Sequence, residues 1–348
     1  MRMNKERFYH ADVVRIVACM MVVLMHSPMP GEIVLYRSMF ASGLTYFTMP
    51  CIGLFFTLSG FLLLPVKTTS DSLKWTYERI KKFIVPLVIW TFVYLLVNGT
   101  LFSGDVVQIT KIFFSIPFSP QGHGVLWFMY VLIGLYFVAP VISPWLQETN
   151  KKTLQCYLTL WGVSLLFPYL EPFIIIRTNA YGVLYYMSGF LGYFFLGYYL
   201  RHYGIKMKPW KALCGIFACM GIYALYRILD KGYELGFEGV FWYLSIDSPL
   251  LVVFWWNLLL PISSRIKSAK ESVRKLVVTM SNLSFGVYLA HILVMRYGLW
   301  KLWIIQNISN YVVQTIVVFM LSMLGTLLLV YAISLTPFSN YIISYKKK

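Results

Sequence analysis

Long runs of apolar residues recur along the chain, and short polar stretches separate them. Most runs have the roughly 20 residues that a helix needs to cross the hydrocarbon core of a bilayer, which is about 30 Å thick. The sequence therefore predicts an all-α fold, a polytopic membrane bundle of about ten transmembrane helices. The predicted spans are residues 10–29, 43–65, 83–103, 124–144, 154–171, 181–200, 212–229, 240–261, 277–297 and 311–335.

The charges between the runs indicate how the bundle is oriented. If the N-terminus is cytoplasmic, the inner segments hold 22 of the 30 lysines and arginines, and the segments on the other side hold seven. Because loops rich in Lys and Arg stay on the cytoplasmic side, we predict that both termini are cytoplasmic. The inner segments are then residues 1–11, 66–82, 145–153, 201–211, 262–276 and 336–348.

Composition agrees with a membrane protein. The chain is 59% hydrophobic and 12% charged, whereas soluble domains are about 25% charged. The net charge of +17 is accounted for by the inner segments, so no nucleic-acid partner is expected. The five cysteines lie inside apolar runs without a C-x-x-C pattern, and we interpret them as buried hydrophobes rather than disulfides or metal ligands. No polar stretch exceeds about twenty residues, so we predict one transmembrane domain over residues 1–348.

The first apolar run carries three ionisable residues on one side. Arg15 and His26 are eleven residues apart, which in a helix places them within about 20° around the axis and about 16 Å apart along it. Asp12 lies about 60° from Arg15 on the same side. Ionisable groups inside a membrane helix are costly, and they mark functional sites by default. We therefore predict a functional stripe, with Arg15 toward the cytoplasm and His26 toward the outer end.

Basic residues gather before the third apolar run, in the sequence WTYERIKKFIVP (residues 75–86). Arg79, Lys81 and Lys82 are predicted just before a helix that has Pro86 in its first turn. They are typical of an anchor at the membrane interface. Alternatively, basic groups at a cytoplasmic pore mouth would suit the phosphates of a nucleotide-like donor.

The second run contains a notch of small residues, Ser59 and Gly60, among bulky ones. Such residues favour close helix packing. The alternative is that they form the wall of a substrate tunnel.

Three further regions contain residues that suit an acceptor site. His123 lies in a Gly-flanked outer loop before Trp127, and it is either a solvated loop histidine or a contact to an acceptor. Asp247 is predicted about six residues into its helix, in an Asp-Ser-Pro sequence that suggests a kink; it caps the freed backbone, is hydrated by a vestibule, or takes part in catalysis. His291 is predicted near the middle of the membrane, one turn after Tyr288, either as a hydrogen-bonded core residue or as a residue that touches or supports the acceptor.

Several stretches together resemble the acyltransferase family 3 membrane proteins. The matching features are the Arg-x10-His pair of the first run, FFTLSGFLL (55–63), RIKKFIVP (79–86), LWFMYVLIGLYFVAP (126–140) and LSFGVYLAH (283–291). They cover residues 8 to about 340 in order. Within the family, the chain is similar to stand-alone enzymes that O-acetylate surface glycans, such as the enterobacterial common antigen O-acetyltransferases.

The resemblance implies an O-acyltransferase of a bacterial inner or plasma membrane. It would move an acyl group, usually acetyl from cytoplasmic acetyl-CoA, onto a hydroxyl of an extracytoplasmic or lipid-linked carbohydrate. No metal is implied, and no fused extracytoplasmic domain is expected. The resemblance leaves open the acceptor's identity, the acyl length, the oligomeric state, and whether His26 is a base or a covalent acyl carrier.

Combined with the residue patterns, the resemblance gives a set of site predictions. The predicted catalytic residues are His26, Arg15 and Asp12. The predicted donor-binding residues are Arg79, Lys81, Lys82, Ser59 and Arg274. The residues predicted to touch or support the acceptor are His291, Tyr288, Trp127, His123 and Asp247.

The alternative function is a membrane carrier or flippase of a glycan or small solute. Ionisable groups inside the membrane suit a transport pathway equally well. Against it, the sequence shows no convincing internal repeat, which many transporter folds have.

Overall fold

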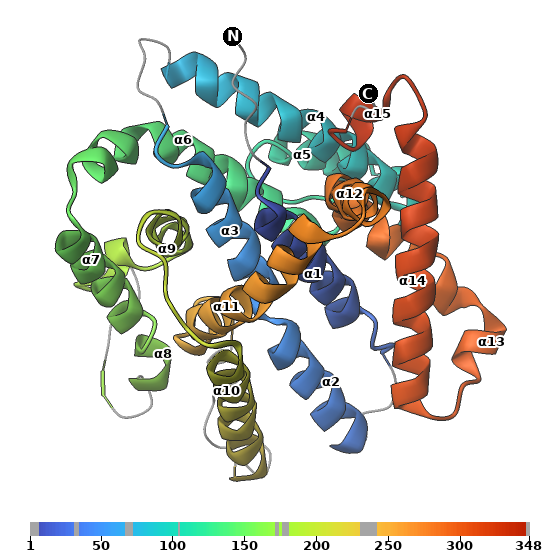
Figure 1. The fold of residues 1–348 in the computed structure, drawn as a ribbon. Coiled ribbons are helices and arrows are strands. Elements are labelled where there is room, and N and C mark those ends of the chain that lie inside the picture. The colour runs from blue at the N-terminus through green and yellow to red at the C-terminus, as the bar shows by residue number, and fades with distance from the viewer. Residues whose placement is uncertain are drawn as a thin grey trace. The chain divides into compact units, whose positions relative to one another are not determined.

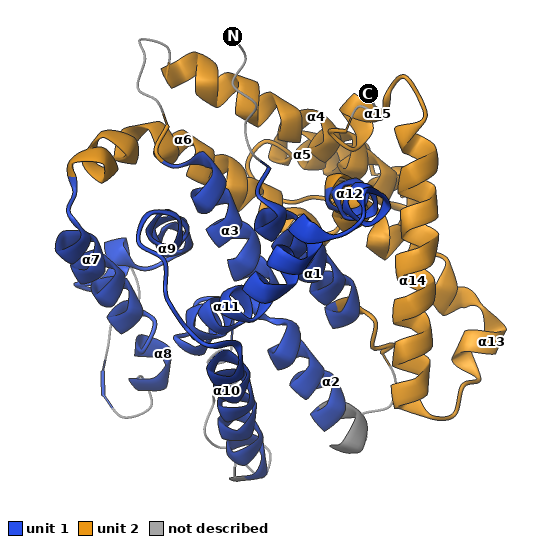
Figure 2. Ribbon diagram, in the orientation of Figure 1, with its two compact units in different colours: residues 1–25, 31–64, 149–281 blue, residues 26–30, 65–148, 282–348 orange. Residues whose placement is uncertain are grey.

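The structure is a computed structural model, and it describes residues 7–30, 35–66, 72–103, 105–170, 174–175, 181–229 and 242–345. These residues form helices joined by short connections (Figure 1). They divide into two compact units, coloured separately in Figure 2, which are described in turn. Parts of the predicted inner segments 1–11, 66–82 and 336–348 lie outside the described residues.

The first unit comprises residues 1–25, 31–64 and 149–281. It holds all but the last residue of α1 and the first part of α12. Its helices are α1 (Tyr9–His26), α2 (Leu35–Thr48), α3 (Pro50–Leu63), α7 (Lys151–Ser164), α8 (Phe167–Leu170), α9 (Leu191–His202), α10 (Pro209–Leu229), α11 (Asp247–Ser268) and the start of α12 (Glu271–Arg296).

Helices α3 and α9 of this unit lie in close contact, and glycines permit it. A Cβ atom on Gly197 would lie 2.0 Å from the Thr57 carbonyl oxygen, and one on Gly60 would lie 2.3 Å from the Phe194 carbonyl oxygen. The two backbones therefore touch, as small residues allow in membrane helices. At the end of α3, Arg201 donates a hydrogen bond of 2.9 Å to the Phe61 carbonyl oxygen. This contact agrees with the prediction that Ser59 and Gly60 allow close helix packing.

The second unit comprises residues 26–30, 65–148 and 282–348. It holds the last residue of α1 and the larger part of α12. Its other helices are α4 (Ser72–Val97), α5 (Val106–Ser115), α6 (Trp127–Glu148), α13 (Trp303–Gln306), α14 (Tyr311–Ser334) and α15 (Ser339–Ile342).

Helix α4 contacts several other elements of the second unit. The ring of Phe83 lies 5.4 Å from that of Tyr136 on α6 and 5.3 Å from that of Phe285 on α12. The Trp90 Nε1–H group donates a 3.0 Å hydrogen bond to the Ile342 carbonyl oxygen of α15. These contacts place α4 between α6, α12 and the C-terminal turn.

Helix α14 exposes apolar side chains and buries polar ones, the reverse of a helix in a water-soluble protein. Its exposed side chains are large and apolar, whereas its buried side chains include several small polar ones. Lipid solvates the apolar face, and small hydroxyl residues allow close helix contacts. The exposed residues are Val313, Ile316, Met320, Leu321, Leu324, Leu328 and Tyr331, and the buried polar ones are Gln314, Thr315, Ser322, Thr326 and Ser334.

Eight helices of the described part are long and apolar enough to cross a membrane. The chain is therefore an integral membrane protein. The spans are Tyr9–His26, Met39–Leu63, Ser72–Val97, Gly124–Glu148, Pro209–Ile228, Asp247–Ser268, Glu271–Lys301 and Tyr311–Ser334.

Two of the ten predicted spans are not among these eight. The segment 154–171 is divided into α7, of 14 residues, and the short α8, and the segment 181–200 contains only the first part of α9, of 12 residues. Helices of that length are shorter than the roughly 17 to 25 residues of a straight span. Whether these two segments cross the membrane stays a prediction.

Helix α4 also differs from its prediction. It begins at Ser72 rather than near residue 83, so Arg79, Lys81 and Lys82 lie inside the helix, and Pro86 lies in its middle rather than in its first turn. A proline is tolerated within a membrane helix because neighbouring groups can satisfy the freed carbonyl.

Candidate active site

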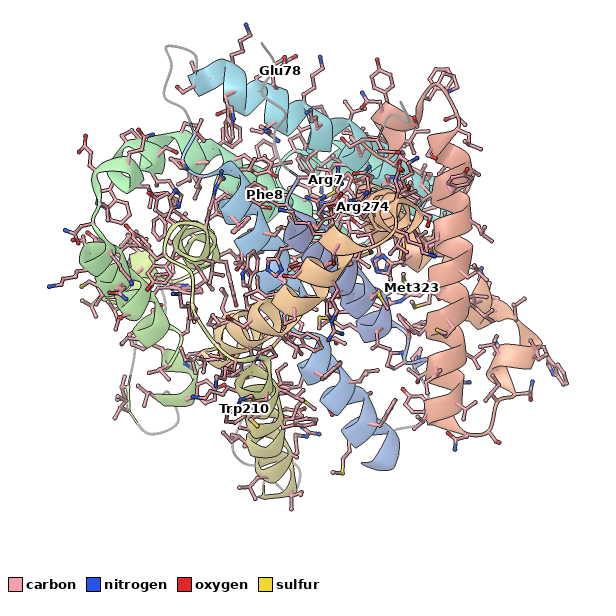
Figure 3. The ribbon with its side chains drawn as sticks, in the orientation of Figure 1. Arg7, Phe8, Glu78, Trp210, Arg274 and Met323 are labelled. Atoms are coloured by element: carbon pink, nitrogen blue, oxygen red, sulfur yellow. The ribbon has the colours of Figure 1, made fainter. Side chains whose placement is uncertain are left out.

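The ionisable residues that the sequence predicts on one side of α1 have separate partners. The Arg7 guanidinium donates two hydrogen bonds, of 2.7 and 2.9 Å, to the two carboxylate oxygens of Asp12. Figure 3 labels Arg7 at the start of the helix. Asp12 is 3% exposed, and its charge is neutralised by the segment that precedes α1. Arg15 instead donates to the Ser281 hydroxyl at 3.2 Å.

Because Asp12 pairs with Arg7, we expect it to hold the N-terminal segment rather than to act on a substrate. Asp12→Asn should lower the free energy of unfolding by about 1–3 kcal/mol, since it weakens a charged hydrogen-bonded pair in which the carboxylate is buried and the Arg7 side chain is partly exposed. Thermal unfolding in detergent would measure the loss, and Arg7→Gln should give a loss of similar size. Loss of activity in Asp12→Asn at unchanged stability would instead support the catalytic prediction.

His26 and His291 face each other in the second unit. His26 is the last residue of α1, and its ring centroid lies 5.5 Å from that of His291 on α12. The chain just after His26 is held by Tyr311, whose hydroxyl donates to the Met29 carbonyl oxygen at 3.1 Å. The structure thus brings together the two histidines that the sequence places deep in apolar runs.

The hydrogen bonds of His291 determine its tautomer. Its Nδ1 lies 2.6 Å from the Tyr288 carbonyl oxygen. Because a carbonyl oxygen can only accept, this nitrogen must carry a hydrogen, and in the neutral ring Nε2 then carries the lone pair. The side chain is fully buried and its Nε2 has no hydrogen-bond partner. His291 therefore has a basic nitrogen, Nε2, without a hydrogen-bond partner, and it lies in the same unit as His26.

His123 is not the solvated loop histidine that the sequence suggests. It is half-buried, its ring lies 5.3 Å from the Tyr94 ring of α4, and its Nδ1 accepts the Val125 N–H at 3.2 Å. Its Nε2 lies 3.4 Å from Nη1 of Arg296 on α12. The side chain packs because the loop folds back onto α4 and α12.

Tyr288 ties this loop to α12. Its hydroxyl donates to the carbonyl oxygen of Val125, and its ring lies 5.5 Å from that of Phe128. The neighbouring Trp127 is the first residue of α6 and is half-buried. On α4, the Tyr94 hydroxyl donates to the Leu289 carbonyl oxygen at 2.7 Å. These bonds hold the loop, α4 and α12 together around the histidines.

Sequence reasoning did not assign Arg296 or Tyr94 to the site. Arg296 is one of the seven basic residues of the predicted outer side, and it lies on α12 five residues after His291. Tyr94 is one of many aromatic residues in an apolar run, and nothing local distinguishes it.

The predicted donor residues have ordinary local partners. Arg79 lies over the Trp75 ring at 5.8 Å and Lys81 over the Tyr77 ring at 5.7 Å, while Lys82 is exposed. Tyr77 also lines an open groove of about 390 Å³ between α4 and α6. The groove is lined mainly by apolar side chains, so it suits an alkyl chain better than a nucleotide.

The other two donor predictions belong to the first unit. The Ser59 hydroxyl donates to the Phe55 carbonyl oxygen of its own helix at 2.9 Å. Arg274 lies near the start of α12 (Figure 3), with Nη1 3.4 Å from the Lys267 carbonyl oxygen. Neither contact indicates a bound ligand.

Asp247 is the first residue of α11 and not a residue within a kinked helix. The Asp-Ser-Pro sequence opens the helix because proline fits the first turn, where its missing N–H is not needed. Asp247 is buried and accepts a hydrogen bond from the Tyr169 hydroxyl.

Among the described residues, no group of three His, Cys, Asp or Glu side chains could hold a metal ion. The residues that converge in the second unit are two imidazoles in contact, a third imidazole, a guanidinium and two tyrosines. Such a set can move a proton and stabilise negative charge.

Comparison with known proteins adds one finding. A family model described as an acyltransferase domain, that of the acyltransferase 3 family, matches residues 8–335. No curated protein and no solved structure matches the chain.

Proposed function

The chain belongs to the acyltransferase 3 family, and on that premise we propose that it transfers an acyl group from a cytoplasmic acyl-CoA to a carbohydrate hydroxyl. We propose acetyl-CoA as the donor. The acceptor is an extracytoplasmic or lipid-linked glycan, as in the O-acetyltransferases that the sequence resembles. The protein works in a bacterial plasma membrane with both termini cytoplasmic. This orientation requires an even number of spans, which leaves both termini on one side.

The contact between His26 and His291 is the observation that supports this proposal most directly. Acyl transfer to an alcohol needs a base that removes the hydroxyl proton as the oxygen attacks. The ring centroids are 5.5 Å apart, and Nε2 of His291 is a buried acceptor without a partner. His26 takes the proton from the acceptor hydroxyl, and His291 offers a second nitrogen to which that proton can pass.

The position of His26 on α1 supports delivery of the donor from the other end of the helix. Arg15 and His26 lie on this one continuous helix, about 16 Å apart at a rise of 1.5 Å per residue. The pantetheine arm of coenzyme A has a similar length, roughly 15–20 Å. The thioester can thus extend past Arg15 to His26 while the nucleotide stays at the basic cytoplasmic end, where Arg79, Lys81 and Lys82 would attract its phosphates.

Turnover by the purified protein tests the proposal. The protein in nanodiscs should transfer label from [14C]acetyl-CoA to at least one of peptidoglycan fragments, lipid-linked oligosaccharide or polysaccharide, as an ester that mild alkali releases. Acyl-CoAs of greater chain length define the acyl preference in the same assay.

A carrier would give a different outcome. Proteoliposomes would then accumulate or flip the glycan without any ester being formed. No transfer from any acyl-CoA to the three acceptor classes, together with such transport, would overturn the proposal.

A further inference from the structure

We propose that His123 and Arg296 form the oxyanion site of the transfer reaction, donating hydrogen bonds to the thioester oxygen as negative charge develops on it. This inference rests on the proposed function and adds a role that neither the sequence patterns nor the family match assigns. It depends on three observations: the tautomer of His123, the unused donors of Arg296, and the hydrogen bonds that link His123 to His291.

The tautomer of His123 follows from its backbone contact. Its Nδ1 accepts the Val125 N–H group at 3.2 Å, so this nitrogen carries the lone pair, and in the neutral ring Nε2 carries the hydrogen. Burial lowers the pKa of His123 to about 4, and the Arg296 charge acts in the same direction, so the ring is neutral at pH 7. His123 therefore presents an N–H donor at Nε2.

That donor points toward another donor. Nη1 of Arg296 lies 3.4 Å from Nε2 of His123, and a guanidinium has no acceptor. The contact cannot be a hydrogen bond between the two side chains, because both nitrogens carry hydrogens. An oxygen atom that accepts from both would satisfy them.

Arg296 has further unused capacity. Its Nε is buried without a hydrogen-bond partner, and its guanidinium lies over the Trp300 ring at 5.1 Å. No ion pair joins it to a carboxylate among the described residues. A half-buried cation without a carboxylate partner, beside a neutral N–H donor, favours an oxygen that becomes negative during the reaction.

A chain of hydrogen bonds, connected through Tyr288 and Val125, links His123 to the basic histidine. His291 donates through Nδ1 to the Tyr288 carbonyl oxygen, and the Tyr288 hydroxyl donates to the Val125 carbonyl oxygen. The Val125 N–H then donates to His123. The same chain leaves Nε2 of His291 with a lone pair and Nε2 of His123 with a hydrogen. Acyl transfer needs this combination, a base for the attacking hydroxyl and donors for the carbonyl oxygen.

In the reaction, the acceptor oxygen bonds to the thioester carbonyl carbon while its proton moves to the His26–His291 pair. The carbonyl π electrons move onto oxygen, which His123 Nε2–H and Arg296 Nη1–H stabilise. The C=O bond then re-forms, the C–S bond breaks, and the coenzyme A thiolate leaves and takes the proton back from the histidine pair. The products are the O-acyl ester and coenzyme A.

Variants of the two donors test the inference through kcat and KM separately. Arg296→Gln and His123→Ala should each lower kcat by roughly 10²- to 10³-fold, with little change in the KM of either substrate. His123→Gln keeps an acceptor for the Val125 N–H and a donor, so it should recover at least tenfold over His123→Ala. Lys301→Gln, which removes an exposed charge nearby, should retain wild-type rates. Size-exclusion profiles and thermal unfolding show which variants are folded.

Each other outcome overturns the inference in a recognisable way. Wild-type kcat in folded Arg296→Gln and His123→Ala would exclude the oxyanion role and leave the proposed function standing. A more than tenfold rise in acceptor KM at unchanged kcat would mean that Arg296 binds a fixed anionic group of the acceptor. His123→Gln as inactive as His123→Ala would indicate a base or acyl carrier. Absence of turnover in the wild type would overturn the proposed function, and this inference with it.

Discussion

Replacing His26 by alanine is expected to lower the rate of acyl transfer by roughly 10²- to 10⁴-fold, the usual contribution of a general base. His26 ends α1 with its ring against His291, and in our proposal it is the group that takes the hydroxyl proton. Loss of the imidazole leaves the donor residues in place, so binding of acyl-CoA should persist while kcat falls. The measurement is ester formation by purified protein, with coenzyme A binding measured in parallel.

His202→Ala is the matched control for this variant. His202 is an exposed histidine at the end of α9, and its Nδ1 lies 3.0 Å from the Tyr198 carbonyl oxygen of its own helix. It should transfer acyl groups at the wild-type rate. A folded His26→Ala protein within threefold of wild type would remove His26 from the chemistry.

A labelling experiment without acceptor shows whether His26 acts as a base or holds the acyl group covalently. Wild-type protein mixed with labelled acyl-CoA and no acceptor should retain no label after a rapid quench if His26 is a base. Label on the protein that disappears in His26→Ala would mean that the histidine holds the acyl group itself.

Gly197→Ala is expected to prevent the protein from folding. A Cβ there would lie 2.0 Å from the Thr57 carbonyl oxygen and 2.6 Å from the Phe61 backbone nitrogen. Both atoms are backbone, so no side chain can move aside, and α3 and α9 would have to separate. Packed interiors tolerate even small added volume poorly. We expect loss of monodisperse protein on size exclusion and, in any folded fraction, a large fall in thermal stability.

Gly221→Ala makes the same chemical change where there is space. Gly221 lies within α10, and a Cβ there would have no atom within 4 Å apart from the adjoining backbone of its own helix. Alanine in a helix interior is favoured over glycine by about 0.5–1 kcal/mol, so this variant should be as stable as wild type or slightly more so. Equal stability of the two variants would contradict the close α3–α9 contact.

The sequence alone determined that this is a helical membrane protein and where most of its spans lie. The length and apolarity of a run are local properties, and eight of the ten predicted runs correspond to helices that can cross a bilayer. It also singled out His26 and His291, because an ionisable residue inside an apolar run is visible without any partner. The family resemblance, carried by motifs such as the Arg-x10-His pair, is likewise a property of the linear sequence, and the family match confirms it.

Only the tertiary structure decided which ionisable groups meet. Helical spacing places Asp12 on the side of Arg15, but a bidentate contact with Arg7 holds its charge, and spacing along one helix cannot show what a preceding segment supplies. His123 looked solvated because glycines flank it, yet it packs on Tyr94 and Arg296, residues 29 and 173 positions away. The hydrogen bonds that set the tautomers of His291 and His123 are local. Which groups their other ring nitrogens face depends on how the loop, α4 and α12 fold against one another, because hydrogen bonds and charge act over only a few ångströms in space.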